Sequence, residues 1–110
     1  MGKFIITKRK DGEYQFNLKT GNGEIILTSE GYVSKSGCKN GIESVKTNSQ
    51  IDSRFERRMA VNNKDYFVLK AGNGEIIGKS QLYSTKQGME DGIDSVKENA
   101  PNAETTDETN

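Results

Sequence analysis

The chain has 110 residues, enough for one domain with a modest hydrophobic core. Its 16 basic and 16 acidic residues cancel, which argues against the strongly charged surface of a protein that seeks nucleic acid or membranes by net charge. No apolar stretch is long enough for a secretion signal or a membrane span, so we expect a cytoplasmic protein with no membrane partner.

Two strands joined by a tight turn are expected at the start of the chain. The segment KFIITKR (3–9) has a core of β-branched residues, and it is followed by Asp11-Gly12, a pair favoured in hairpin turns. In EYQFNLK (13–19), apolar and polar residues alternate, as they do in a strand with one buried face. These segments predict a β-hairpin.

The glycine-rich segment GNGEII (21–26) admits two interpretations. A phosphate-binding loop leads from a strand into a helix, whereas a hairpin turn leads into another strand. Here the glycines lead into EIILTS (24–29), so a turn is favoured, and this segment predicts a third strand. The register stays open, because a two-residue loop sets Leu27 opposite Leu18 and a three-residue loop sets Ile26 there.

The repeat ends in a predicted helix over residues 34–48. Its apolar stripe consists of Cys38, Ile42 and Val45. Ser34 is a suitable N-cap, and Asn48 suits a left-handed position at the C-terminal end. A glycine inside a helix costs about 1 kcal/mol relative to alanine. Gly41 therefore indicates a neighbouring backbone or aromatic ring that lies very close to the helix.

The whole pattern occurs twice. When residues 4–48 are aligned with residues 55–99, 20 of the 45 pairs are identical, without a gap. We therefore predict an α+β fold of two tandem β-β-β-α repeats, residues 2–48 and 54–99, in one domain over residues 1–99. The repeats are expected to share one antiparallel sheet around a pseudo-twofold axis, with both helices on one face. The acidic tail, residues 100–110, is expected to be disordered.

The paired motifs resemble a known family. GNGEII in both copies, GIESVKTN (41–48) with GIDSVKEN (92–99), and Tyr32 with Tyr83 are similar to the YegP-like family of small uncharacterised bacterial proteins with a duplicated domain. The resemblance implies two β3-α repeats in one antiparallel sheet, with the helices exchanged across the twofold axis. It implies no catalytic residue, cofactor or activity.

Residue types argue against most catalytic chemistry. The chain has no histidine and one cysteine, Cys38, which aligns with Met89 on the apolar stripe and is therefore interpreted as a core residue. We expect no catalytic residue, no metal and no cofactor. The favoured function is a non-catalytic binding or interaction module. The alternative is an enzyme without a recognisable catalytic motif.

Cations near the first strand of each repeat admit two interpretations, phosphate contacts or a sheet edge kept soluble by charge. They are Lys8, Arg9 and Lys10 in the first repeat, and Arg54, Arg57 and Arg58 in the second.

A ligand site is expected on the sheet face that the helices leave open. By strand parity this face carries Tyr66, Val68, Lys19, Lys70 and Arg58, an aromatic ring with cations around it. Single-stranded nucleic acid, a nucleotide or an acidic protein segment fits such a patch. The competing interpretation is that a loop, a chain terminus or a second protomer covers Tyr66. We expect a monomer or a weak dimer.

Overall fold

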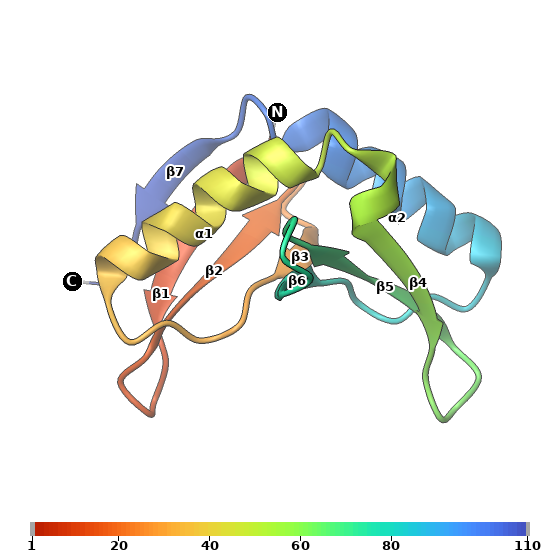
Figure 1. Cartoon of the computed structure of the whole chain (residues 1–110), viewed down its shortest axis with the longest axis horizontal. Helices are drawn as coiled ribbons and strands as arrows, with labels where there is room; N and C mark the ends of the chain where they lie inside the picture. Colours follow the sequence, from red (N-terminus) through yellow and green to blue (C-terminus); the bar gives the residue numbers. More distant parts are fainter. Residues whose placement is uncertain (1, 110) are drawn as a thin grey trace.

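The computed structural model describes residues 2–109 and contains the β-β-β-α order twice, followed by one more strand (Figure 1). The first repeat consists of β1 (Lys3–Lys8), β2 (Tyr14–Lys19), β3 (Ile25–Thr28) and α1 (Lys35–Asn48). The second consists of β4 (Phe55–Met59), β5 (Asp65–Lys70), β6 (Ile76–Lys79) and α2 (Lys86–Asn99). A short 3-10 turn (Asp52–Arg54) precedes β4, and β7 (Glu104–Asp107) ends the series.

One sheet runs through the molecule in the order β4-β5-β6-β3-β2-β1-β7. The first six strands are antiparallel, as predicted, and the two repeats meet where β3 pairs with β6. The sheet bends into an arch with β3 and β6 in the middle and the β1–β2 and β4–β5 hairpin tips as its two feet (Figure 1). A pseudo-twofold axis therefore passes between β3 and β6.

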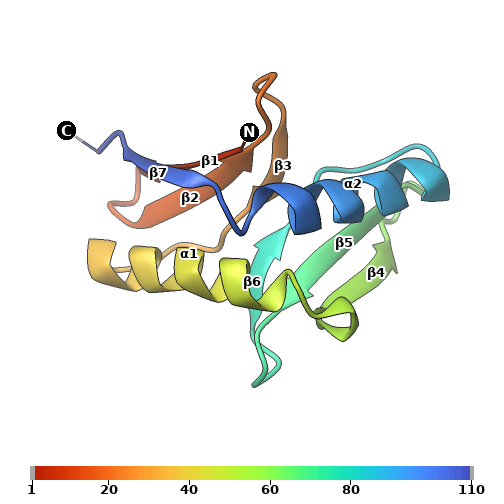
Figure 2. The ribbon, with the colours of Figure 1, turned by 90° about the horizontal axis from the view of Figure 1, so that it is seen from above.

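Both helices cover the same face of the sheet, as Figure 2 shows from above. Each helix packs on the middle strand of its own repeat and on the third strand of the other: α1 on β2 and β6, α2 on β5 and β3. The expected exchange of helices is therefore partial. A helix of 14 residues is long enough to cross the axis while it keeps the contact with its own strand.

The core lies between this face and the helices. It contains apolar residues from the strands and the helix stripes of both repeats. These residues are Phe4, Phe16, Leu18, Ile42, Val45, Phe55, Phe67, Leu69, Ile93 and Val96.

Four hairpin turns share one construction. In each, the first residue closes the turn by donating its N–H to the carbonyl of the residue four positions later, as Thr20 does to Glu24 at 2.9 Å. The residue just before the one that provides this carbonyl has a positive φ angle, which glycine adopts without strain. Gly12, Gly23 and Gly74 hold this position, and Asn63 holds it in the remaining turn with φ 63°. The glycines of GNGEII are therefore turn residues.

A β-bulge resolves the open register. The loop contains three residues, yet Leu27 and not Ile26 lies opposite Leu18. The pairing shifts between Leu18 and Lys19, so Ile26 is the extra residue on β3, and its side chain is buried. The second repeat repeats the bulge, with Gly78 opposite Leu69.

The helix starts agree with the prediction and the helix ends do not. The Ser34 hydroxyl accepts a hydrogen bond from Gly37 N–H at 3.0 Å, and Thr85 caps α2 in the same way. Asn48, however, is helical, and its side-chain amide donates to the carbonyl of Ser44 at 2.8 Å. The left-handed C-terminal position expected for Asn48 is therefore wrong, because the helix continues one residue further, and Asn99 is helical in the same way.

The helix glycines approach aromatic rings, as predicted. A Cβ atom at Gly41 would lie 2.7 Å from Cζ of Tyr32 and 3.1 Å from Cε2 of Phe16. The equivalent distances at Gly92 are 2.7 Å to Tyr83 and 3.3 Å to Phe67. Both tyrosines stack on these phenylalanines. Each helix therefore lies directly on an aromatic pair.

The tail is corrected by the structure. Residues 104–107 form β7, which runs parallel to β1 and makes the sheet mixed rather than purely antiparallel. Ala100 and Ala103 are buried. The composition of the tail hid this outcome because its strand is stabilised by the backbone ladder and by an ion pair from Asp107 to Lys35, not by large apolar side chains.

Candidate functional site

The open face is the sheet surface opposite the helices. Residues that pair directly across neighbouring strands point to the same face, so the register defines its central row. This row consists of Ile5, Asn17, Thr28, Lys79, Val68 and Glu56. Tyr66 and Lys70 flank Val68 on β5, and Arg58 pairs with Tyr66 from β4. Four of the five residues expected in the ligand site thus come from two adjacent strands.

Val68 is a correction to the predicted site. It is on the expected face, but only 1% of its surface is exposed. Its neighbours on this face are Tyr66, Lys70, Lys79 and Glu56, and side chains of this length can cover a central valine while their polar ends stay in water. Val68 therefore supports the patch from below and does not present a surface to a ligand.

Tyr66 remains accessible at its partly buried position. The Nζ atom of Lys79, on the adjacent strand β6, lies 5.1 Å from the centre of the Tyr66 ring. Arg58 pairs with Tyr66 across the strands, and Glu56, followed by the Tyr66 phenol, raises the pKa of the Arg58 guanidinium. The ring is therefore surrounded by cations from two neighbouring strands.

Glu56 holds two of the predicted cations. Its carboxylate contacts Lys70 Nζ at 2.5 Å and also pairs with Arg58. Hydrogen bonds from Lys70 and then Arg58 hold the pKa of Glu56 below its usual range. Lys70 and Arg58 are thus partly neutralised in the unliganded protein, whereas Lys79 makes no ion pair within residues 2–109.

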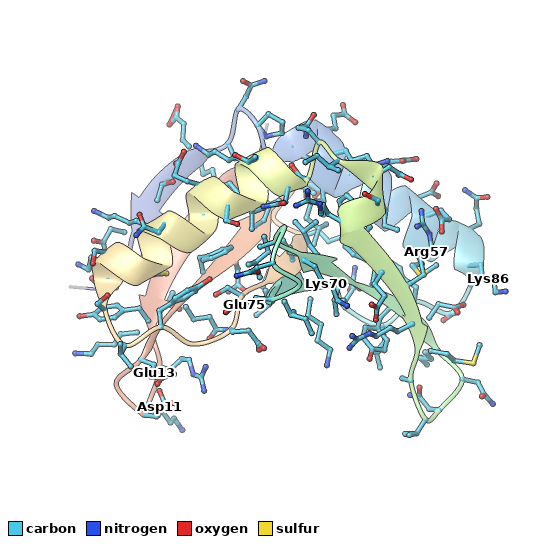
Figure 3. All side chains as sticks on the ribbon, in the orientation of Figure 1. Asp11, Glu13, Arg57, Lys70, Glu75 and Lys86 are labelled. Atoms are coloured by element: carbon cyan, nitrogen blue, oxygen red, sulfur yellow. The ribbon has the colours of Figure 1, made fainter. Side chains whose placement is uncertain are left out.

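Lys19 is not brought together with the other predicted residues. It ends β2, and the strands β3 and β6 separate it from β5. With neighbouring strands about 4.8 Å apart, β2 and β5 are separated by about 14 Å. Because β2 and β5 are antiparallel, Lys19 and Lys70 also lie at opposite ends of the sheet. In Figure 3, Lys70 lies near the middle of the arch.

A central cavity of about 450 Å³ lies beside this patch, where β3 and β6 meet. Lys79 belongs to its wall, together with the carboxylates of Glu24 and Glu30. The Gln81 amide crosses the junction and donates to Glu24 at 3.1 Å. The remaining wall consists of Gly23, Ile25, Thr28, Ser29, Ser80 and Gln81. The cavity adjoins the Tyr66 ring through Lys79.

Nucleophilic and metal chemistry find little support in the described residues. Burial raises the pKa of the Cys38 thiol to about 11, so the reactive thiolate is scarce at neutral pH. Residues 2–109 contain no group of three or more carboxylate, thiol or imidazole side chains placed to hold a metal ion. Among the same residues, neither helix is long and apolar enough to cross a membrane.

Lys79 is the residue of the patch that sequence reasoning missed. Its partner in the first repeat is Thr28, so the duplication gave no reason to select it. The signal lies in the register: once the bulge on β6 is known, Lys79 is opposite Val68 and next to Tyr66. A three-residue loop without the bulge would assign Lys79 to the helix-covered face.

Comparisons with known proteins agree with the duplicated fold. The family model described as a domain of unknown function, DUF1508, matches residues 10–56 and again residues 60–107. A UPF0339 protein of Acinetobacter baylyi is 52% identical over 98% of this chain and 97% of its own length. UPF0339 protein YegP of Escherichia coli K12 is 49% identical over 98% of both chains.

Solved structures have the same fold. The solution NMR structure of a UPF0339 protein from Shewanella oneidensis superposes with a TM-score of 0.93 and 49% identity, and it covers 98% of this chain and 92% of that one. The solution NMR structure of yegP from E. coli, described as a protein of unknown function, has a TM-score of 0.94 and 49% identity, and it covers 98% of this chain and 93% of that one.

Proposed function

The chain belongs to the DUF1508 family, and we propose that it is a non-catalytic binding module that holds single-stranded nucleic acid on its open face. The observation that carries the proposal is the Tyr66 ring, which is partly exposed beneath Lys79. Nucleobases stack on such rings irrespective of base identity, and adjacent lysines contact the phosphates.

The energetics favour exchange of Lys79 for a base. A cation over an exposed aromatic ring contributes about 0.5–1 kcal/mol. A base stacked on an aromatic side chain contributes about 1–3 kcal/mol. A base can therefore take the place of Lys79 on the ring of Tyr66, and Lys79 then reaches a phosphate with no ion pair to break.

An extended ligand suits the arrangement better than a mononucleotide. A single nucleotide reaches Tyr66 and Lys79, whereas Lys19 is three strands away. A short single strand that follows the arch reaches Lys19 as well as Tyr66 and Lys79. Its phosphates also compete with Glu56 for Arg58 and Lys70, so the full set of cations becomes available only when a polyanion is bound.

The test is titration of the protein with a short single-stranded oligonucleotide at low salt, followed by amide NMR. We expect shifts that cluster at Tyr66, Val68 and Lys79. Tyr66→Gln restores the residue type of the equivalent position in the first repeat, Gln15, and is expected to weaken binding about tenfold. Lys79→Gln is expected to reduce the salt slope by about one.

Lys39→Gln is the matched control, because Lys39 is an exposed lysine of α1, on the helix-covered side of the sheet and away from the open face. It is expected to leave the affinity almost unchanged. Adenosine monophosphate in a parallel titration separates the two ligand classes, since we expect it to bind more weakly than the oligonucleotide. A saturating oligonucleotide that shifts no amide on the open face, or one that binds Tyr66→Gln equally well, would contradict the proposal.

A further inference from the structure

The two outer edges of the sheet differ. β7 pairs with the outer edge of β1. The equivalent edge of β4 has no strand beside it within residues 2–109. The pseudo-twofold axis relates these edges, so the tail covers one of two similar strand edges and leaves the other uncovered.

The covered edge of β1 shows how an acidic strand is held. The carbonyl of Ile6 on β1 accepts a hydrogen bond from the N–H of Glu108 at 2.8 Å. Asp107 pairs with Lys35, at the first turn of α1, with 2.8 Å between Oδ2 and Nζ. The bond from Lys35 is the main reason why the pKa of the Asp107 carboxyl lies well below its usual range. Backbone pairing and one lysine thus hold the strand.

The uncovered edge of β4 has the same two features, a free strand edge and a lysine at the first turn of the adjacent helix. Ile6 corresponds to Arg57 on β4, and Lys35 corresponds to Lys86 at the first turn of α2. Lys86 makes no ion pair within residues 2–109. Figure 3 shows Arg57 and Lys86 at the same outer end of the molecule. A hollow of about 300 Å³ lies between β4 and α2, lined by Arg57, Arg58, Met59, Asp65, Lys86, Met89 and Glu90.

Backbone groups of β4 are available for pairing. Ala60 and Lys64 form a hydrogen-bonded pair at the hairpin turn, so alternate residues of β4 direct their N–H and C=O groups toward β5. The backbone groups of Arg57 and Met59 therefore point away from the sheet, whereas the N–H of Phe55 donates to the carbonyl of Asp52 in the preceding 3-10 turn. Such an edge is a template for another strand unless its charges repel that strand.

We propose that the outer edge of β4 binds an extended acidic segment of another protein as an eighth strand, parallel to β4, with a carboxylate on Lys86. Lys86, which makes no ion pair within residues 2–109, disfavours basic segments and attracts acidic ones. The bond from Arg57 to Glu90, 2.9 Å from Nη2 to Oε1, leaves Lys86 as the cation that needs a partner. A second copy of the chain is a poorer occupant, because its own acidic strand is already held on its β1.

The probe is a synthetic peptide with the sequence of residues 102–110, NAETTDETN, added to the full-length protein and followed by amide NMR. We expect shifts along β4 and the first turns of α2, and none along β1, where the covalently attached tail competes. A peptide with all three acids changed to amides, NAQTTNQTN, is expected to bind several-fold more weakly.

Lys86→Gln tests the ion pair. It is expected to weaken the peptide about two- to fivefold, the range of a partly exposed ion pair, whereas Lys64→Gln, on the adjacent hairpin tip, leaves the affinity unchanged. Three results would overturn the proposal: no shifts on β4 at millimolar peptide, equal binding of the amide peptide, or shifts confined to β1 and β7. Concentration-dependent self-association with shifts on β4 would also overturn it, because the occupant would then be a second copy.

Discussion

The two repeats have one skeleton, and they differ where a twofold axis cannot be obeyed. Leu27 and Gly78 are equivalent positions that meet across the axis, and a Cβ atom at Gly78 would lie 2.6 Å from Cγ of Leu27. There is room for one large side chain. The edges differ for a similar reason, since one tail covers β1 and none is left for β4. The two repeats thus keep the same contacts within each repeat. They differ at the axis, where side chains of both repeats meet, and at the outer edges, where one tail is available for two strands.

The strongest local requirement is the contact between helix and aromatic pair. Gly92→Leu forces a side chain into the Tyr83 and Phe67 rings, and we expect a loss of about 3 kcal/mol in the free energy of unfolding. Gly41→Leu is expected to cost a similar amount, since the same contacts occur in the first repeat. Denaturant unfolding measures both. A variant with the midpoint of the wild type would show that the helix can move away freely.

The axis gives the next largest effect. Gly78→Leu places a second leucine against Leu27, whose side chain can yield, so we expect about 2 kcal/mol of destabilisation. The double variant Leu27→Gly with Gly78→Leu exchanges the two residues across the axis. It is expected to recover most of that loss in denaturant unfolding. If the double variant is less stable than Gly78→Leu, the two positions are not interchangeable and the axis is not a packing symmetry.

Much of this comparison was predictable from sequence. The strands, the turn glycines, both N-caps and the helix–aromatic approach follow from residue patterns within one repeat. The bulges at Ile26 and Ile77 were not predictable, because a loop of three residues is compatible with a regular register as well. A three-residue loop with a regular register puts Lys79 on the helix-covered face, and this hid Lys79 from the candidate site.

The tail was harder to predict, because its order depends on a distant partner. Thr105 and Thr106 favour a strand, but their acidic neighbours are typical of a disordered segment. Only the placement of Lys35 beside the β1 edge explains why Asp107 is held there. The burial of Val68 likewise depends on side chains from three adjacent strands. The sequence of one strand does not contain that information.

The helix N-caps provide a finer test of equivalence. Ser34→Ala and Thr85→Ala each remove the acceptor for one N–H group of the first helical turn. Each is expected to cost about 1 kcal/mol in denaturant unfolding. The structure predicts equal losses within error, because the two caps have the same geometry. A much larger loss in one repeat would show that its helix start is coupled to something that the other lacks.

The smallest effect concerns β7 alone. The hydrogen bond from Lys35 lowers the pKa of Asp107. The ion pair therefore stabilises β7 fully above the unfolded pKa of about 3.9, and this stabilisation is lost as pH falls through the lower folded pKa. We therefore expect protection of the β7 amides to persist from pH 7 to about pH 4. Asp107→Asn is expected to speed their exchange over this pH range, with little change in the global midpoint. Unaltered exchange of β7 in Asp107→Asn would show that the ladder alone holds the strand.

The central claim is that one edge of a symmetric sheet is covered and the other is available. Native-state hydrogen exchange of Ile6 and Arg57, equivalent residues on β1 and β4, tests it most directly. We expect the Ile6 amide to be strongly protected and the Arg57 amide to exchange fast. Truncation after Pro101 is expected to lower the protection of Ile6 to the level of Arg57. Equal protection of the two amides in the full-length protein would contradict the account.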